Sequence, residues 1–459
     1  MKNQTRDLTK GTPWKQIVIF SLPLIVSFLF QNLYNVADSI IVGNLLGDKS
    51  LAAVSSSGSF IFLFTSFFLG LAMGCGSLIG KYFGEKNEEK LHKSIHSAVA
   101  IGLICSVILT LVAELLSPLL LKLMGTPDTV INESVSYFRA YFIGGIGLVM
   151  YAMLNSILHA VGNSRRGLYY LIFASLLNIG LDLILVKPLG VFGAGLGSSI
   201  SQICSATLAF LFLIKKGTIY QVKVKEIRFY KGVTKQMVTL GIPSGIQNSV
   251  IAIANVFVQS FINSFGDVAM AGCGSHARIE GFAFVPINGF TGAITNFVSQ
   301  NLGAKEFERA KKGARFGIIT SVIIAELIGV IDFVFAPQLI SLFTSTPECI
   351  EIGAKQARTV ALFYCLLSYS HCVSAVCRGG GKPVVPMLVM LIDWCLIRVT
   401  YISIAMSINH EIQLLFWAYP ITWAISSIFY VFYYYLSDWV HGFEKRDLKL
   451  LEQENKSAR

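Results

Sequence analysis

The sequence predicts an all-α polytopic membrane protein, with twelve transmembrane helices in two six-helix lobes that are related by a parallel internal repeat. Three observations carry this prediction. The 459-residue chain is 54% hydrophobic and only 14% charged, which is far from the composition of soluble globular proteins. Its apolar runs of about 20 residues are long enough to cross a hydrocarbon core as helices. Finally, short motifs that contain proline, glycine and charged residues recur at matching positions in both halves of the chain.

Twelve apolar segments are expected to span the membrane. The first follows a polar start and is longer than the apolar core of a signal peptide, so we expect it to be retained. Strands of a barrel would be shorter and would alternate in polarity, which excludes that class. The predicted spans cover residues 14–41, 51–83, 94–121, 131–161, 167–186, 192–214, 236–265, 277–302, 313–336, 352–377, 383–408 and 412–436.

A basic loop, KKGTIYQVKVKEIRFYKGVTK at 215–235, separates six spans from six. We therefore expect an N-terminal lobe at 1–214, a cytoplasmic linker at 215–235, a C-terminal lobe at 236–436 and a cytoplasmic tail at 437–459. Alternate loops are basic, and this positive-inside pattern predicts a multi-pass protein of the inner or plasma membrane with both termini in the cytoplasm.

The net charge of +11 follows this topology. Because the basic residues lie in alternate loops, we expect them to contact membrane lipid, and we expect no nucleic-acid partner. The nine cysteines are an odd number without a Cys-x-x-Cys pair, so we expect neither a disulfide framework nor a metal site. No motif of a metalloenzyme or a nucleophilic enzyme is found, and we expect that the protein is not an enzyme.

The two halves align at a nearly constant offset. KQIVIFSLP at 15–23 matches KQMVTLGIP at 235–243, and YFGEKN at 82–87 matches NLGAKE at 301–306. Because each half has an even number of predicted spans, the repeats run in the same direction across the membrane. Transporters built from parallel repeats bind substrate near the bilayer midplane between the halves, so the repeat favours a carrier over a channel.

Two carboxylates in the first half stand out because a charge within an apolar span is costly, by roughly 2.5 kcal/mol or more. Gln31, Tyr34 and Asp38 share one face of the first helix, and Asn178 and Asp182 share a face of the fifth. If the two Asp side chains approach, their mutual repulsion favours uptake of a proton, and the same oxygens can hold Na⁺. The alternative is that they are interhelical hydrogen-bond partners that only fix packing.

Four segments together resemble the multidrug and toxic compound extrusion (MATE) family. They are VADSIIVGNLLGDKSLAAV at 36–54, GKYFGEKN at 80–87, NIGLDLILVKPLGVFGAGLGSSISQ at 178–202 and SQNLGAKEFERAKKGARFG at 299–317. The resemblance implies an antiporter that exports small organic, often cationic, compounds in exchange for H⁺ or Na⁺ by alternating access. It implies no other cofactor. We expect a monomer.

The resemblance also implies a coupling-ion site like that of the DinF-like branch, because 243–257 lacks the Glu on helix seven that the NorM-like branch tends to use. Asp38, Asp182 and Asn178 are then the candidate Na⁺ ligands, and Ser198 takes the place of a hydroxyl on helix six. The implied proton or ion site comprises Gln31, Tyr34, Asp38, Asn155, Asn178, Asp182 and Ser198.

Other candidates are weaker. Pro23 can kink the first helix and form part of a gate, although a static kink is the alternative. Glu280 faces substrate or is structural. Met73 and Phe64 are candidates to line a substrate cleft by cation–π contact, although most aromatic and methionine side chains of membrane helices only pack.

The alternative function is a flippase for a lipid-linked oligosaccharide or cell-wall precursor, although such relatives often have fourteen spans and a cationic cleft.

Overall fold

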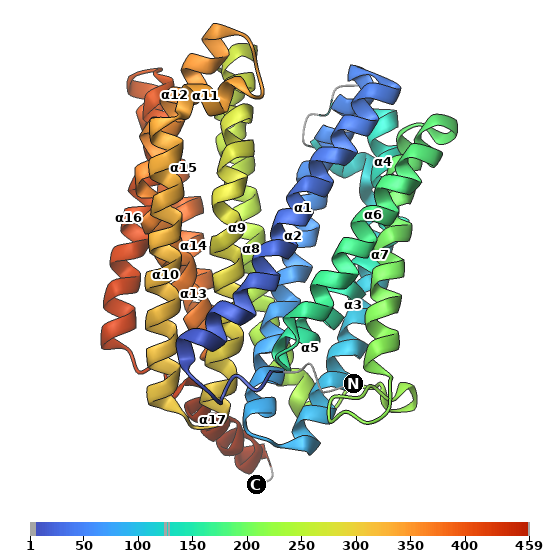
Figure 1. Cartoon of the computed structure of the whole chain (residues 1–459), viewed down its shortest axis with the longest axis vertical. Coiled ribbons are helices and arrows are strands. Elements are labelled where there is room, and N and C mark those ends of the chain that lie inside the picture. Colours follow the sequence, from blue (N-terminus) through green and yellow to red (C-terminus); the bar gives the residue numbers. More distant parts are fainter. Residues whose placement is uncertain (1–5, 124–125, 127–128, 458–459) are drawn as a thin grey trace. The chain divides into compact units, whose positions relative to one another are not determined.

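The computed structural model describes residues 6–123, 126 and 129–457, and every regular element within them is helical (Figure 1). Two short 3₁₀ helices, η1 (Val224–Glu226) and η2 (Ala361–Phe363), and a π-helical segment, η3 (Leu391–Ile397), interrupt the α-helices. The α-helices are α1 (Pro13–Leu46), α2 (Asp48–Gly84), α3 (Glu88–Leu123), α4 (Ile131–Ile143), α5 (Gly145–Ala160), α6 (Ser164–Leu189), α7 (Val191–Leu213), α8 (Lys231–Asn263), α9 (Asp267–Gly303), α10 (Phe307–Val334), α11 (Ala336–Ser341), α12 (Pro347–Val360), α13 (Tyr364–Gly379), α14 (Val384–Met390), α15 (Arg398–Ile408), α16 (Ile412–Leu436) and α17 (Gly442–Ser457).

These helices confirm an all-α, multi-pass membrane protein. In the described part of the chain, ten helical segments are long and apolar enough to cross a membrane, and α4 with α5 makes an eleventh if the bent pair is one span. The predicted span 277–302 lies inside α9, and α9 is not among the helices that are long and apolar enough to cross a membrane. Polar side chains such as Arg278, Glu280 and Asn296 interrupt the apolar run of α9. The number of twelve spans stays a prediction.

The predicted span 131–161 is broken at Gly144, where α4 and α5 meet at a bend of 49°. Ser199 of α7 fills the break: its Oγ accepts a hydrogen bond from the Gly144 N–H at 3.1 Å. The same oxygen lies 2.6 Å from the carbonyl of Ala140, a group at a helix end that needs a donor. A side chain at Gly144 would collide with Ser199, because an added Cβ would lie 2.5 Å from the Ser199 Cβ.

By their contacts, the described residues form two compact units. The first contains residues up to Asp7 and from Val26 to Asn248, and the second contains Leu8–Ile25 and the residues from Ser249 onward. Helices α1 and α8 therefore each contribute to both units, and each changes unit a few residues after its internal proline, Pro23 or Pro243. The lobes proposed from the sequence remain a prediction.

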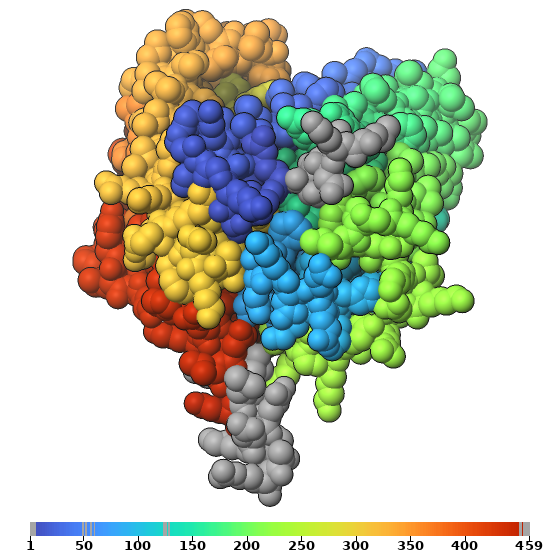
Figure 2. Space-filling view, turned by 60° about the horizontal axis from the view of Figure 1, so that its bottom comes forward, coloured from blue at the N-terminus to red at the C-terminus, as the bar shows by residue number. Residues whose placement is uncertain are grey.

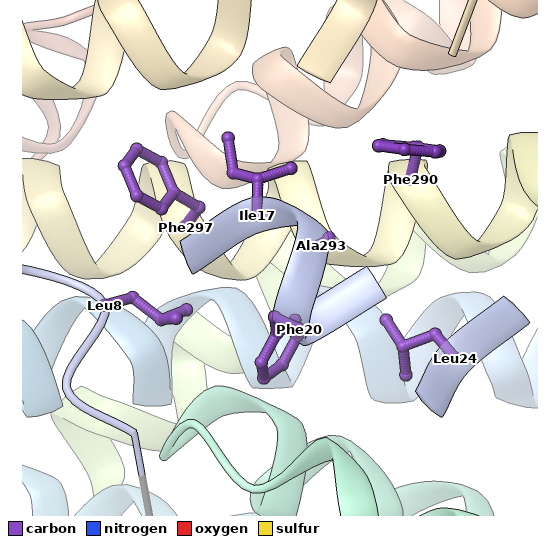
Figure 3. Close-up of a cluster of buried hydrophobic side chains, with 7 residues drawn as sticks. All are labelled: Leu8, Ile17, Phe20, Leu24, Phe290, Ala293 and Phe297. Atoms are coloured by element: carbon purple, nitrogen blue, oxygen red, sulfur yellow. The ribbon is translucent and has the colours of Figure 1, made fainter. Parts of the chain in front are cut away.

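In the second unit, the start of α1 packs on α9. Apolar side chains from 8–24 interdigitate with aromatic side chains of α9 in one buried cluster (Figure 3). The Leu8 N–H donates to Gln300 Oε1 at 3.0 Å, and Asn301 Nδ2 donates to the Leu8 carbonyl at 3.2 Å. This cluster explains why the first part of α1 belongs to the second unit. It comprises Leu8, Ile17, Phe20, Leu24, Phe290, Ala293 and Phe297.

In the first unit, α2 and the start of α8 approach through glycines. Gly70 and Gly74 are one turn apart on α2, and they face Gly241 and Gly245 on α8. A Cβ added at Gly74 would lie 2.5 Å from the Gly241 Cα, so the two backbones are in direct contact there. Such small-residue pairs let helices pack closely in a membrane, where the solvent provides little hydrophobic drive for association.

We predict that Gly74→Ala destabilises the protein, because its methyl group would overlap the α8 backbone. Overpacking of this kind costs about 1–3 kcal/mol, so the melting temperature in detergent should fall by several degrees. The control is Gly58→Ala on the same helix, where an added Cβ meets nothing within 4 Å. Equal melting temperatures for the two variants would contradict this packing.

Candidate functional site

The carboxyl groups of Asp38 and Asp182 meet inside the first unit. Asp38 lies on α1 and Asp182 on α6, and their side chains interact directly. Both are buried, with 8% and 0% of their surface exposed. Among the described residues, neither carboxyl group forms a salt bridge with a basic side chain. The predicted meeting of the two carboxylates is therefore present in the structure, and no basic side chain of the described residues balances their charge.

Three polar side chains connect this pair to α1 and α7. The Asn178 carboxamide satisfies its neighbours when its nitrogen donates to Asp182 Oδ2 at 3.1 Å and its oxygen accepts from the Ser198 backbone N–H at 3.1 Å. The Tyr34 hydroxyl lies 3.0 Å from Ser198 Oγ. The structure thus brings together Tyr34, Asp38, Asn178, Asp182 and Ser198, five of the seven residues that the sequence assigns to this site.

Glycines of α7 allow this close arrangement. Helices α6 and α7 lie side by side (Figure 1), and a Cβ added at Gly197 would lie 2.4 Å from Asp182 Oδ1. A Cβ added at Gly193 would lie 2.2 Å from the Leu185 carbonyl oxygen. The motif GAGLGS at 193–198 therefore has a steric role: it removes the side chains that would keep α7 away from the acidic face of α6.

Two tyrosines of α4, which the sequence analysis did not select, complete the surroundings. Tyr137 and Tyr141 are one turn apart, and both lie close enough to Asp38 for an electrostatic interaction. Gln202 of α7 donates to the Tyr141 hydroxyl at 2.9 Å. Their spacing of four residues places them on one helix face, but aromatic residues at that spacing commonly serve packing alone, so the sequence offered no distinguishing signal.

The other two predicted members are not brought to the carboxylates. Asn155 lies against Gly167, where an added Cβ would be 2.0 Å from Asn155 Oδ1. Gly167 precedes Asn178 by three turns of α6, or about 16 Å along its axis. Gln31 is exposed and makes no hydrogen bond within the described part of the chain. The structure does not bring these two side chains to the acidic pair, because a sequence motif does not fix the depth at which each helix meets its neighbour; their assignment to the ion site stays a prediction.

The weaker candidates occupy several environments. Pro23 lies inside α1, just before the helix changes unit. Phe64 packs edge-to-face on Phe142 with ring centroids 5.9 Å apart, and Met73 is half-buried on the same helix α2. Glu280 is half-buried on α9 in the second unit. None of these four is part of the Asp38–Asp182 cluster.

The second unit has a buried polar cluster of its own, which the sequence analysis did not assemble. Tyr364 donates to Asp332 Oδ2 at 3.1 Å, and His276 Nε2 lies 3.6 Å from the same oxygen. Arg398 is fully buried, donates to Thr422 Oγ1 at 2.7 Å and stacks on aromatic rings. Glu280 interacts electrostatically with both Asp332 and Arg398, so a basic side chain accompanies the acidic ones here and the two units differ in charge balance as well as in sequence.

The comparison with known protein families decides the classification. The MatE family model matches twice, at residues 23–184 and at 243–404, so that each match begins at one of the two equivalent prolines. The chain belongs to the MatE family.

Relatives of this MatE protein span nearly its full length. The probable multidrug resistance protein YoeA of Bacillus subtilis is 28% identical over 444 residues, which cover 94% of this chain and 95% of the relative. YpnP of the same organism, also a probable multidrug resistance protein, is 29% identical over 405 residues, which cover 87% and 89%. A transporter of the MOP superfamily from Pyrococcus furiosus shares the fold, with a TM-score of 0.87 at 24% identity over 94% and 96% of the chains.

We predict that Gly197→Ala impairs the site of this MatE protein without unfolding it. The new methyl group would displace the Asp182 carboxyl group and so separate it from Asp38 and Asn178. Transport of a dye substrate by cells that carry this variant should fall several-fold at equal expression. Gly180→Ala is the matched control, because an added Cβ there meets nothing within 4 Å. Normal transport by the Gly197 variant would show that the close approach is not needed.

Proposed function

We propose that this protein is an antiporter that exports small organic, often cationic, compounds, and that it couples export to the entry of H⁺ or Na⁺ at Asp38 and Asp182. The observation that carries the proposal is the direct contact of two buried carboxyl groups that have no basic partner in the part of the chain that the structure describes. A purely structural pair would be expected to include a counter-charge, because an unbalanced buried charge is strongly destabilising.

The coupling ion supplies the missing charge. Two carboxylates side by side in a medium of low dielectric constant repel each other, and a cation bound between them removes this repulsion. A proton can bind without any change at Asn178, whose nitrogen already faces Asp182. Sodium prefers oxygen ligands, so its binding would require the Asn178 carboxamide to turn its oxygen toward the ion.

Helix α1 links this chemistry to movement. It carries Tyr34 and Asp38 in the first unit, whereas its beginning, up to Ile25 and including Pro23, belongs to the second unit. A change in the charge of Asp38 alters which position of the Asp38-bearing part of α1 is favoured. Pro23 gives the helix a point at which to bend. Ion binding then shifts the balance between conformations only to the extent that the ion binds one of them more tightly.

The cargo class rests on the relatives. YoeA and YpnP are named as probable multidrug resistance proteins, and these names favour drug export over the flippase alternative. The basic loops support a place in the cell membrane with both termini in the cytoplasm. We propose that the protein acts there as a monomer.

We predict that Asp38→Asn and Asp182→Asn each abolish coupled export from proteoliposomes, because a neutral amide neither repels its partner nor takes up the coupling ion. Melting temperatures should stay near that of the wild type. Asp267→Asn, at an exposed position on α9, is the control and should transport normally. Full transport by either site variant would refute the coupling role.

The coupling ion is identified by imposing one gradient at a time. Proteoliposomes in sodium-free buffer with a pH gradient should export dye if H⁺ couples transport, whereas a sodium gradient at equal pH should drive export if Na⁺ does. If the protein binds dye but neither gradient drives its export, ion coupling would be contradicted, whereas the family assignment would stand.

A further inference from the structure

The linker 215–235 is held by hydrogen bonds to the end of α7 and to the start of α3. Val222 is buried, and its N–H donates to the Leu213 carbonyl at 2.8 Å. Farther along, the Tyr230 N–H donates to Ser97 Oγ at 3.2 Å. In Figure 2 the yellow-green linker lies beside the light-blue beginning of α3. The proposed transport cycle assigns no role to this attachment.

Three metal-ligating side chains meet at the attachment. His92 and His96 are one turn apart on α3, with ring centroids 3.9 Å apart, and Glu226 comes from η1 of the linker. Glu226 Oε2 contacts His92 Nε2 directly. One ligand atom from each of the three residues lies within 4.8 Å of the others. Two imidazoles and a carboxylate from two separate elements thus converge on one point.

Hydrogen bonds to neighbouring groups orient these side chains in the same way as hydrogen bonds orient the ligands of known metal sites. His96 Nδ1 lies 2.7 Å from the His92 carbonyl oxygen, which can only accept, so Nδ1 carries the proton and Nε2 carries a lone pair. Lys223 Nζ donates to Glu226 Oε1 at 3.0 Å. Metal-binding histidines typically donate their second nitrogen to a carbonyl in this way, and metal-binding carboxylates are themselves hydrogen-bonded.

There is space for an ion and for water. A cavity of about 460 Å³ borders the cluster, and its wall includes His92 and Glu226 together with Glu88, Glu89 and Tyr230. Two basic side chains, Lys93 and Arg228, also line this wall, and Lys93 pairs with Glu89, so the support for a metal ion comes from the ligand atoms and not from the net charge of the wall. At present His96 Nε2 accepts a hydrogen bond from the Lys223 backbone N–H at 2.9 Å. A metal ion would take the place of this donor.

We propose that His92, His96 and Glu226 form a binding site for a divalent transition metal ion such as Zn²⁺, which joins the linker to α3. Nitrogen and carboxylate oxygen are ligands that Zn²⁺ accepts in tetrahedral sites, and water from the cavity can supply a fourth ligand. Because the ligands come from both elements, the bound ion holds the linker on the first unit. This proposal is independent of ion coupling at Asp38 and Asp182.

Titration calorimetry of the purified full-length protein with Zn²⁺ tests the site. His92→Ala and Glu226→Gln each remove a ligand and should weaken Zn²⁺ binding by more than about tenfold. His441→Ala is the control: His441 also pairs with a carboxylate, Asp438, but it belongs to no cluster of metal-ligating side chains among the described residues, so its loss should leave the affinity unchanged. Wild-type affinity in the His92 and Glu226 variants would overturn the proposal.

Limited trypsin digestion provides an independent readout, because the linker contains cleavage sites at Lys223, Lys225 and Arg228. Zn²⁺ should slow cleavage there several-fold in the wild type. His96→Asn retains a side-chain oxygen that can accept from the Lys223 N–H but lacks the imidazole ligand, so its cleavage should no longer respond to Zn²⁺. Cleavage of the wild-type linker that is unaffected by Zn²⁺ would overturn the proposal even if the ion binds elsewhere.

Discussion

The contact between the carboxyl groups of Asp38 and Asp182 is the interaction on which the organisation of the first unit depends. Two such groups cannot be buried side by side at low cost unless hydrogen-bond donors surround them. Asn178 donates to Asp182, the Ser198 N–H of α7 in turn donates to the Asn178 oxygen, and Gly197 lets the α7 backbone come near enough. The neighbouring Ser199 meets a different need by filling the break between α4 and α5. One short stretch of α7 therefore supports both the acidic pair and the bend beside it.

The sequence predicted the centre of this site well because its members are set by spacing on single helices. Tyr34 with Asp38, and Asn178 with Asp182, share faces that any helix of this sequence must present. Which residues of other helices come near is decided by packing depth, which spacing does not encode. Asn155 consequently lies about three turns from the predicted position, and Tyr137 was not selected although it lies next to the acidic pair.

The fold shows the same division between local and long-range information. Helical structure and most apolar spans followed from composition and run length. The break at Gly144 could not be predicted in this way, because a glycine inside an apolar run gives no sign of a break unless Ser199 is known to lie against it. The changes of unit within α1 and α8 were also not apparent, since both helices are continuous in sequence and in secondary structure. Their prolines indicated a bend but not a change of partner.

The central claim is that Asp38 and Asp182 bind the ion whose binding competes with the exported compound. Its most direct test is the equilibrium affinity of the purified protein for a fluorescent cationic dye, measured over a range of pH values and sodium concentrations. We expect the wild-type affinity to fall as one of the two ions becomes more abundant, since coupling between two ligands is reciprocal. A wild-type affinity that changes with neither pH nor sodium would contradict the claim.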